Sequence, residues 1–172
     1  NLGISGGSHA SMTAAMLVAL EETLLKEKPD MVLLYGDTNT TLAGALAAAK
    51  IHIPIAHVEA GYRTRSLTNP EEVNRVCADH VSSLLFAVTQ QCLANLREEG
   101  LEDRSQFVGD PMYDAVVRAR QKACGMSHEL VCFDGSVRDI PGDYYYLTCH
   151  REENPADDNA LREVLAAMDE LD

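Results

Sequence analysis

The chain has 172 residues, 46% of them hydrophobic and 24% charged, a composition typical of a globular protein with a sizeable core. Its formal net charge of -13 excludes nucleic-acid binding through a clustered basic surface. No apolar run is long enough to cross a bilayer, and five cysteines without a Cys-x-x-Cys pair favour a reducing, cytoplasmic compartment.

Short apolar runs alternate with segments of helical periodicity along the chain. Helices are expected at 11–28, 40–50, 70–82, 90–99, 112–122 and 160–171. Strands are expected at 31–35, 53–58, 84–88, 106–109 and 144–149. This alternation predicts βαβ units with right-handed connections, so the expected fold class is α/β with a Rossmann-like parallel sheet.

Two local patterns make these expectations more specific. The run from Met31 to Tyr35 is continuously apolar, which is typical of a strand covered on both faces. Asn69 is expected to cap the helix that begins at Pro70, because asparagine accepts a backbone hydrogen bond there and proline fits the first helical turn.

Residues 123–143 lack clear periodicity and are rich in glycine, so we interpret them as a connector with a short helix near 127–131. This divides the chain into residues 1–122, the remainder of an N-terminal Rossmann-like domain, and residues 144–172, the first strand–helix unit of a C-terminal domain. A single strand–helix unit is not a domain by itself. Either the second domain is cut short, or the unit packs as an appendage on the first.

Titratable side chains follow the predicted strands within two residues of each strand end. These side chains are Asp37, Glu59, Asp110 and His150. The carboxyl ends of parallel strands meet at one edge of the sheet, where open α/β sheets bind their ligands. Asp37 or Asp110 alone is more simply interpreted as a helix cap, whereas Glu59 is a poor cap and is costly to bury without a partner.

Glu71 and Glu72 fall in the first turn of a predicted helix, where the helix dipole alone explains either carboxylate. Carboxylates gathered at one edge can nevertheless divide acid and base roles. Three arginines can pair with diphosphate oxygens, although each alone is more simply a surface residue: Arg63, Arg75 and Arg151. The histidines lack metal-ligand spacing, so no metal is expected.

Five motifs, in order, resemble the non-hydrolysing UDP-N-acetylglucosamine 2-epimerases of bacteria and archaea. They are Lys28-Pro29-Asp30 leading to Tyr35-Gly36-Asp37-Thr38, Ile53-Pro54-Ile55-Ala56-His57-Val58-Glu59-Ala60-Gly61-Tyr62-Arg63-Thr64, Pro70-Glu71-Glu72-Val73-Asn74-Arg75, Gly109-Asp110-Pro111-Met112-Tyr113-Asp114-Ala115-Val116 and Cys149-His150-Arg151-Glu152-Glu153-Asn154. Each motif is modest, but the ordered set is highly specific and covers nearly the whole chain. Departures from the family pattern include Asp110, where asparagine is usual.

The resemblance implies a two-domain, glycosyltransferase-B-like fold with the active site between its domains, and this chain is expected to be truncated at both ends. It implies interconversion of UDP-GlcNAc and UDP-ManNAc at C2, by anti elimination of UDP to a 2-acetamidoglucal and re-addition. It further implies no NAD and no metal, a cytoplasmic homodimer, and a place in polysaccharide biosynthesis.

By position in these motifs, Asp37, Glu59 and Glu71 are the candidate acid/base carboxylates, without assignment of a face to each. The resemblance gives His150 the role of binding or protonating the departing diphosphate, and gives Arg151 and Arg75 a role in ordering the site or binding phosphate. The open alternatives are a UDP-sugar glycosyltransferase of the same fold, a hydrolysing epimerase, and an inactive nucleotide-binding or dimerisation module.

Overall fold

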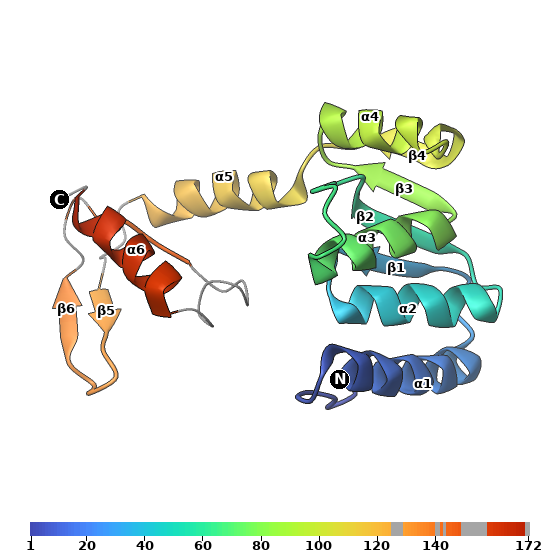
Figure 1. Cartoon of the computed structure of the whole chain (residues 1–172), viewed down its shortest axis with the longest axis horizontal. Helices are drawn as coiled ribbons and strands as arrows, with labels where there is room; N and C mark the ends of the chain where they lie inside the picture. Colours follow the sequence, from blue (N-terminus) through green and yellow to red (C-terminus); the bar gives the residue numbers. More distant parts are fainter. Residues whose placement is uncertain (125–128, 140–141, 143, 149–157, 171–172) are drawn as a thin grey trace. The chain divides into compact units, whose positions relative to one another are not determined.

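A computed structural model describes residues 1–124, 129–139, 142, 144–148 and 158–170. The chain divides into two compact units, Asn1–Gln121 and Lys122–Asp172. Figure 1 labels the elements of both units. In the part of the chain that the structure describes, no helix has both the length and the apolar character needed to span a membrane.

The first unit is a parallel sheet with helices between its strands (Figure 1). The strands are β1 (Val32–Tyr35), β2 (Ile55–Ala60), β3 (Leu84–Ala87) and β4 (Ser105–Phe107). The helices are α1 (His9–Glu27), α2 (Asn39–Lys50), α3 (Pro70–Val81), α4 (Gln90–Glu98), the short η1 (Glu102–Arg104) and α5 (Pro111–Ala123), which extends past residue 121. The sheet order is β1-β2-β3-β4, every pair is parallel, and the predicted α/β class is confirmed.

The predicted start of α3 is confirmed in atomic detail. The Oδ1 of Asn69 accepts a hydrogen bond from the N–H of Glu71 at 2.9 Å, and Pro70 is the first helical residue. The same kind of cap occurs at α1 and α4, where the side chains of Ser8 and Thr89 accept from the N–H groups of Ser11 and Cys92. Polar caps therefore fix where these helices begin, next to the carboxyl edge of the sheet.

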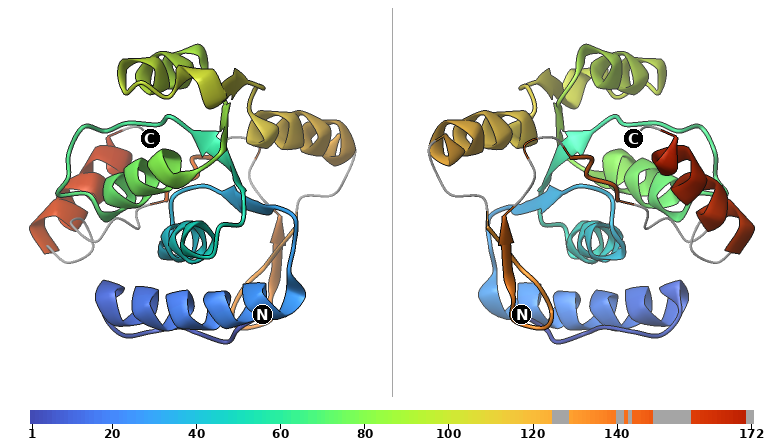
Figure 2. Two further views of the ribbon diagram at one scale, coloured as in Figure 1. Left: turned by 90° about the vertical axis from the view of Figure 1, so that its right-hand side faces the viewer. Right: turned by 90° about the vertical axis from the view of Figure 1, so that its left-hand side faces the viewer.

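Small side chains allow α2 to lie close against the sheet. Its buried residues are one threonine, four alanines and one glycine, and an added Cβ on Gly44 would lie 3.0 Å from Cδ2 of Leu34. Helix α1 packs on α2, and α3 lies beside α2 over β2 (Figure 2). A further core cluster joins the ends of β2 and β3 to α4: Ala60, Leu85, Ala87, Val88, Cys92, Leu96 and Leu101. This packing fixes the strand ends that carry the candidate site.

The prediction that residues 31–35 form a strand covered on both faces is wrong. Leu34 faces Gly44 of α2, and because side chains alternate along a strand, Leu33 and Tyr35 point to the opposite face. There they are 51% and 59% exposed. The reason is that β1 is the edge strand of this sheet and the described helices that contact it pack on one face.

The second unit contains a hairpin and a helix. Strands β5 (Glu129–Val131) and β6 (Val137–Asp139) pair antiparallel, and α6 spans Asp158–Asp169, confirming the predicted last helix. The short helix expected near 127–131 is wrong over 129–131, because the turn at Asp134 and Gly135 closes a hairpin instead. The strand expected at 144–149 is also wrong over 144–148, where no described strand pairs with the backbone.

Candidate active site

Glu59 occupies a bulge at the carboxyl end of β2. Val58 lies opposite Phe86 and Ala60 lies opposite Ala87, so Glu59 is an extra residue with no partner on β3. Its φ of 70° is left-handed, which costs a residue other than glycine about 1–3 kcal/mol. The predicted strand end at residue 58 therefore missed the bulge, which changes the direction of the Glu59 side chain.

The structure brings Asp37, Glu59 and Asp110 together at the carboxyl edge of the sheet. Burial is the main cause that raises the pKa of Glu59, and the negative charges of Asp110 and Asp37 raise it further. His57 acts in the opposite direction and is outweighed. Glu59 is therefore a carboxyl group that accepts a proton more readily than an ordinary glutamate does.

A hollow of about 300 Å³ opens beside these carboxylates. Its lining includes Tyr35, Val58 and Gly109, which precede Asp37, Glu59 and Asp110 by one or two residues. Tyr35, Val58 and Phe86 lie side by side in register across three strands and form an apolar floor. An apolar hollow bordered by a few polar groups is the usual form of a small-molecule site.

Helix α3 holds the turn that carries Asp37. The Nη2 of Arg75 donates to Oδ2 of Asp37 at 2.5 Å, and its Nη1 donates to Oε2 of Glu72 at 3.0 Å. The side-chain amide of Asn74 donates to the Asp37 carbonyl at 2.9 Å. Within the described part of the chain, Nε of Arg75 is a buried donor with no hydrogen-bond partner. Arg75 thus lies beside a candidate carboxylate and retains one donor.

Glu71 and Glu72 are neighbours with different surroundings. Glu71 is exposed, and its position three and four residues before Asn74 and Arg75 puts it on the helix face that reaches Asp37. Glu72 is 2% exposed and accepts from the N–H groups of Thr64 and Arg65 at 2.9 and 2.7 Å. Burial raises the pKa of Glu72, but these hydrogen bonds and the Arg75 charge outweigh it and lower the pKa overall.

The simpler helix-cap interpretation holds for one of the two aspartates. The Oδ1 of Asp110 accepts from the N–H of Met112 at 2.8 Å and so caps the start of α5. At α2 the capping position belongs to Thr38, not to Asp37. The Asp37 carboxylate is instead bound by Arg75 and its side chain is 35% exposed.

Arg63 belongs to a group of charged side chains that we call the buried clamp, namely His57, Arg63, Asp79 and Glu99, of which Glu99 is 28% exposed and the others are buried. Arg63 contacts Asp79 through Nη1 at 2.8 Å and Glu99 through Nη2 at 2.6 Å. Burial lowers the pKa of Arg63, but the hydrogen bonds and charges of Glu99 and Asp79 more than compensate and raise it overall. These contacts favour a structural role for Arg63 over contact with a diphosphate.

Neither Asp79 nor the buried role of His57 was predicted from the sequence. The Nδ1 of His57 lies 2.7 Å from Oδ1 of Asp79, and both side chains are fully buried. One signal was available: Glu72, Arg75 and Asp79 recur at intervals of three and four residues. Such spacing places charged residues on one face of a helix, and here that face is buried.

His150 and Arg151 lie outside the described residues, so their predicted roles at the diphosphate stay predictions. Among the residues that are described, no group of three or more His, Cys, Asp or Glu side chains is arranged to hold a metal ion.

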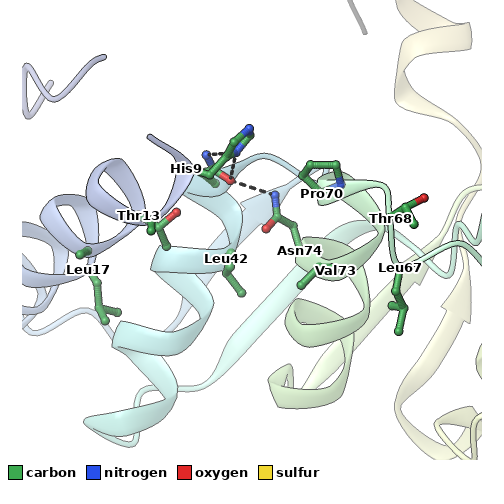
Figure 3. Close-up of a pocket in the computed structure, with 12 residues that line it drawn as sticks. His9, Thr13, Leu17, Leu42, Leu67, Thr68, Pro70, Val73 and Asn74 are labelled. Carbon is green, nitrogen blue, oxygen red and sulfur yellow. Dashed lines mark hydrogen bonds between the residues drawn. The ribbon is translucent and has the colours of Figure 1, made fainter. Parts of the chain in front are cut away.

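A second, larger hollow of about 630 Å³ lies among α1, α2 and α3 (Figure 3). Asn39 connects its rim, because its side-chain amide lies 3.0 Å from Nδ1 of His9 and its Oδ1 accepts from Asn74 at 3.2 Å. The walls are mostly apolar, with Leu17 and Leu42 drawn in Figure 3. Asn74 therefore connects this hollow to the Asp37 turn.

Comparison with known proteins gives a consistent result along the whole chain. A family model described as UDP-N-acetylglucosamine 2-epimerase matches residues 1–172. A relative from Methanocaldococcus jannaschii, named UDP-N-acetylglucosamine 2-epimerase, is 44% identical over 99% of this chain and 46% of its own length. A relative from Pseudomonas aeruginosa, named UDP-2,3-diacetamido-2,3-dideoxy-D-glucuronate 2-epimerase, is 43% identical over 99% of this chain and 46% of its own length.

The similarity extends to solved structures. The crystal structure of Methanocaldococcus jannaschii UDP-GlcNAc 2-epimerase, in complex with UDP-GlcNAc and UDP, has a TM-score of 0.71 and 48% identity. That match covers 73% of this chain and 35% of the other chain. The present chain thus spans about half the length of the curated relatives that it matches.

Proposed function

This chain belongs to the UDP-N-acetylglucosamine 2-epimerase family, and we propose that the whole protein interconverts UDP-GlcNAc and UDP-ManNAc at C2. The observation that carries the proposal is the cluster of Asp37, Glu59 and Asp110 at the sheet edge, in which burial and neighbouring charge raise the pKa of Glu59. Inverting a carbon through loss and return of its hydrogen needs groups that take and give protons.

In the proposed reaction a carboxylate takes the proton from C2 while the C1–O bond breaks and UDP departs with the electron pair. The product is a 2-acetamidoglucal with a double bond between C1 and C2. A second carboxyl group then delivers a proton to the opposite face of C2, and UDP re-adds at C1. Two acids on two faces are sufficient for this sequence, without a cofactor.

Three described residues are proposed for this proton transfer. Glu59 is suited to carry a proton because burial and neighbouring negative charges raise its pKa above the usual value. Asp37 is held in place by Arg75, and Glu71 lies on the same face of α3 as Arg75, one turn earlier. His150 and Arg151 are proposed, from the sequence, to bind the departing diphosphate. We leave the two faces of C2 unassigned.

The second candidate function is the same reaction on a different sugar. The Pseudomonas aeruginosa relative, named for UDP-2,3-diacetamido-2,3-dideoxy-D-glucuronate, is nearly as similar as the relative named for UDP-GlcNAc, at 43% against 44% identity. The acid/base chemistry at C2 is unchanged by substituents at C3 and C6. The two candidates therefore differ in binding groups and share the carboxylates.

The test is incubation of the whole protein with each UDP-sugar in deuterated water. We expect deuterium at C2 of both epimers of the true substrate, because the proton returns from solvent-exchanged acids. Protein with Glu59→Gln is the matched control. Transfer of the sugar to an acceptor without C2 deuterium would support a glycosyltransferase instead, and release of free N-acetylmannosamine would support a hydrolysing epimerase.

We also propose the finer expectations drawn from the family: a two-domain protein with residues 123–143 as connector, a homodimer, and a cytoplasmic location. The four described cysteines, Cys77, Cys92, Cys124 and Cys132, are free thiols, which fits a reducing compartment. Sedimentation of the whole protein tests the dimer, and a monomer at working concentration would contradict it.

A further inference from the structure

The buried clamp takes no part in the proton transfer proposed above. His57 and Asp79 are fully buried, and the side chain of Arg63 is 4% exposed. Removing ionised groups from water costs several kcal/mol for each ion unless close partners compensate. A core of ordinary apolar side chains would avoid that cost, so the presence of these charges calls for a specific role.

His57 lies between two hydrogen-bond acceptors. Its Nδ1 is 2.7 Å from Oδ1 of Asp79, and its Nε2 is 2.8 Å from the carbonyl oxygen of Gly36. A neutral imidazole carries one N–H and can donate to only one of them. Both acceptors are satisfied when both ring nitrogens carry hydrogen. The positive charges of His57 and Arg63 then balance the negative charges of Asp79 and Glu99.

Asp79 also holds the bulge. Its Oδ2 accepts from the N–H of Gly61 at 3.0 Å and from Nη1 of Arg63 at 2.8 Å. The carbonyl of Gly61 accepts from the side-chain amide of Asn95 at 2.9 Å. Both backbone polar groups of Gly61 are thus bound, two residues after Glu59. A strained backbone such as that of Glu59 persists only where its surroundings fix it in this way.

The clamp therefore connects two segments that are distant in sequence. Gly36, which accepts from His57, immediately precedes Asp37, whereas Gly61, which donates to Asp79, follows Glu59 by two residues. His57 and Asp79 form the bridge between these two attachments. This bridge adds to the pairing of β1 with β2, in which the N–H of Gly36 donates to the Val58 carbonyl at 3.2 Å.

We propose that His57 and Asp79 are positioning residues, which fix the turn carrying Asp37 against the bulge carrying Glu59 while His57 carries a proton on each ring nitrogen. The inference rests on the proposed function, because it concerns the geometry of that reaction. A catalytic group misplaced by about 1 Å lowers a rate by about 10²-fold.

The experiment compares His57→Gln and Asp79→Asn with Ser82→Ala in the whole protein. Ser82 is a matched control because it is also fully buried and directly follows α3, the helix that carries Asp79. Its hydroxyl donates to the Ala78 carbonyl at 2.7 Å and makes no contact with the clamp in the hydrogen bonds described. We expect kcat for C2 epimerisation of UDP-GlcNAc to fall about 10- to 100-fold in the two clamp variants, with KM changed by less than about 3-fold. Ser82→Ala should lose thermal stability and keep its kcat.

Values of kcat within about 2-fold of wild type in the clamp variants would overturn the proposal, by the same scale. A loss of kcat in Ser82→Ala in proportion to its loss of stability would also overturn the proposal, because general destabilisation would then explain the kcat of the clamp variants. If a clamp variant does not fold, neutron diffraction from crystals of the wild-type protein decides: hydrogen on both His57 nitrogens supports the inference, and hydrogen on one overturns it. Absence of C2 exchange in the wild-type protein would instead overturn the proposed function.

Discussion

The sheet edge and the buried clamp beneath it contain the same types of side chain in opposite surroundings. At the edge, Asp37 is 35% exposed and binds one guanidinium, while Glu59 has a raised pKa. In the clamp, Asp79 is fully buried and contacts donors from His57, Gly61 and Arg63. A carboxylate that accepts from several donors holds neighbouring groups in place, whereas a carboxylate with few donors is available to contact a ligand.

Glu71 and Glu72 show the same contrast within one turn of helix. Glu71 is exposed, whereas Glu72 is buried and accepts hydrogen bonds from two backbone N–H groups and from Arg75. Isosteric glutamine substitutions separate the two roles, because they remove charge and keep volume. Glu71→Gln should affect turnover, and Glu72→Gln should affect stability.

The largest expected effect is on turnover. Glu59→Gln and Glu71→Gln in the whole protein should each lower kcat about 10²- to 10⁴-fold, because a positioned acid or base contributes on that scale. Circular dichroism and thermal unfolding should show a folded protein in both cases. Glu98→Gln is the control, since Glu98 is an exposed glutamate paired with Arg65. Wild-type rates in either edge variant would remove that residue from the mechanism.

The next effect is on the stability of the bulge. Gly61 has φ 86°, and an added Cβ would lie 2.4 Å from the Cys92 carbonyl oxygen, so Gly61→Ala combines backbone strain with steric overlap. We expect a loss of about 3 kcal/mol or more. Gly100→Ala is the matched control, because φ is 74° there and the space is open. It should cost about 1 kcal/mol from strain alone. Equal losses in the two variants, measured by denaturant unfolding, would contradict the close packing at Gly61.

A smaller, pH-dependent effect is expected at Glu72. Because the pKa of Glu72 is lowered in the folded protein, its ionised form stabilises the fold above its usual value of 4.5. Glu72→Gln should therefore cost about 2 kcal/mol at neutral pH, from lost charge-assisted hydrogen bonds. The difference between wild type and variant should disappear as pH falls below 4.5 through the lowered pKa. A difference independent of pH would contradict this.

The smallest expected effect is the pH dependence of stability at Glu59, and its sign is opposite to that expected at Glu72. Its pKa is raised in the folded protein, so the stability it contributes is present below its usual value of 4.5 and is lost as pH rises through the raised pKa. Glu59→Gln should therefore gain stability relative to wild type between acid and neutral pH while it loses activity. Thermal unfolding at several pH values tests the sign. If Glu59→Gln became less stable relative to wild type as pH rises, the predicted sign would be wrong.

Most of the first unit could be predicted from the sequence because its signals are local. Asn69 and Pro70 predict the start of α3, and short apolar runs mark the strands β1, β2 and β3. The exposure of Leu33 and Tyr35 could not be read from their own composition, since it depends on which elements cover the sheet. The hairpin at residues 129–139 was missed because strands of three residues carry almost no periodicity.

The candidate site could be predicted in part. The order of strands and acids was enough to place Asp37, Glu59 and Asp110 at one edge, since parallel strands share their direction. The bulge at Glu59 and the bridge from His57 to Asp79 depend on contacts between residues more than 20 positions apart, which no local pattern shows.

The extra residue in β2 has a consequence for how this protein can vary. Glu59 has no partner on β3, so removing it would leave a regular ladder without the bulge, whereas removing one of the residues 55–58 would turn the following side chains to the other face. A deletion in this segment would therefore misdirect its buried side chains, His57 among them, or remove the bulge that carries Glu59. Among homologous chains, its length should vary less than its composition.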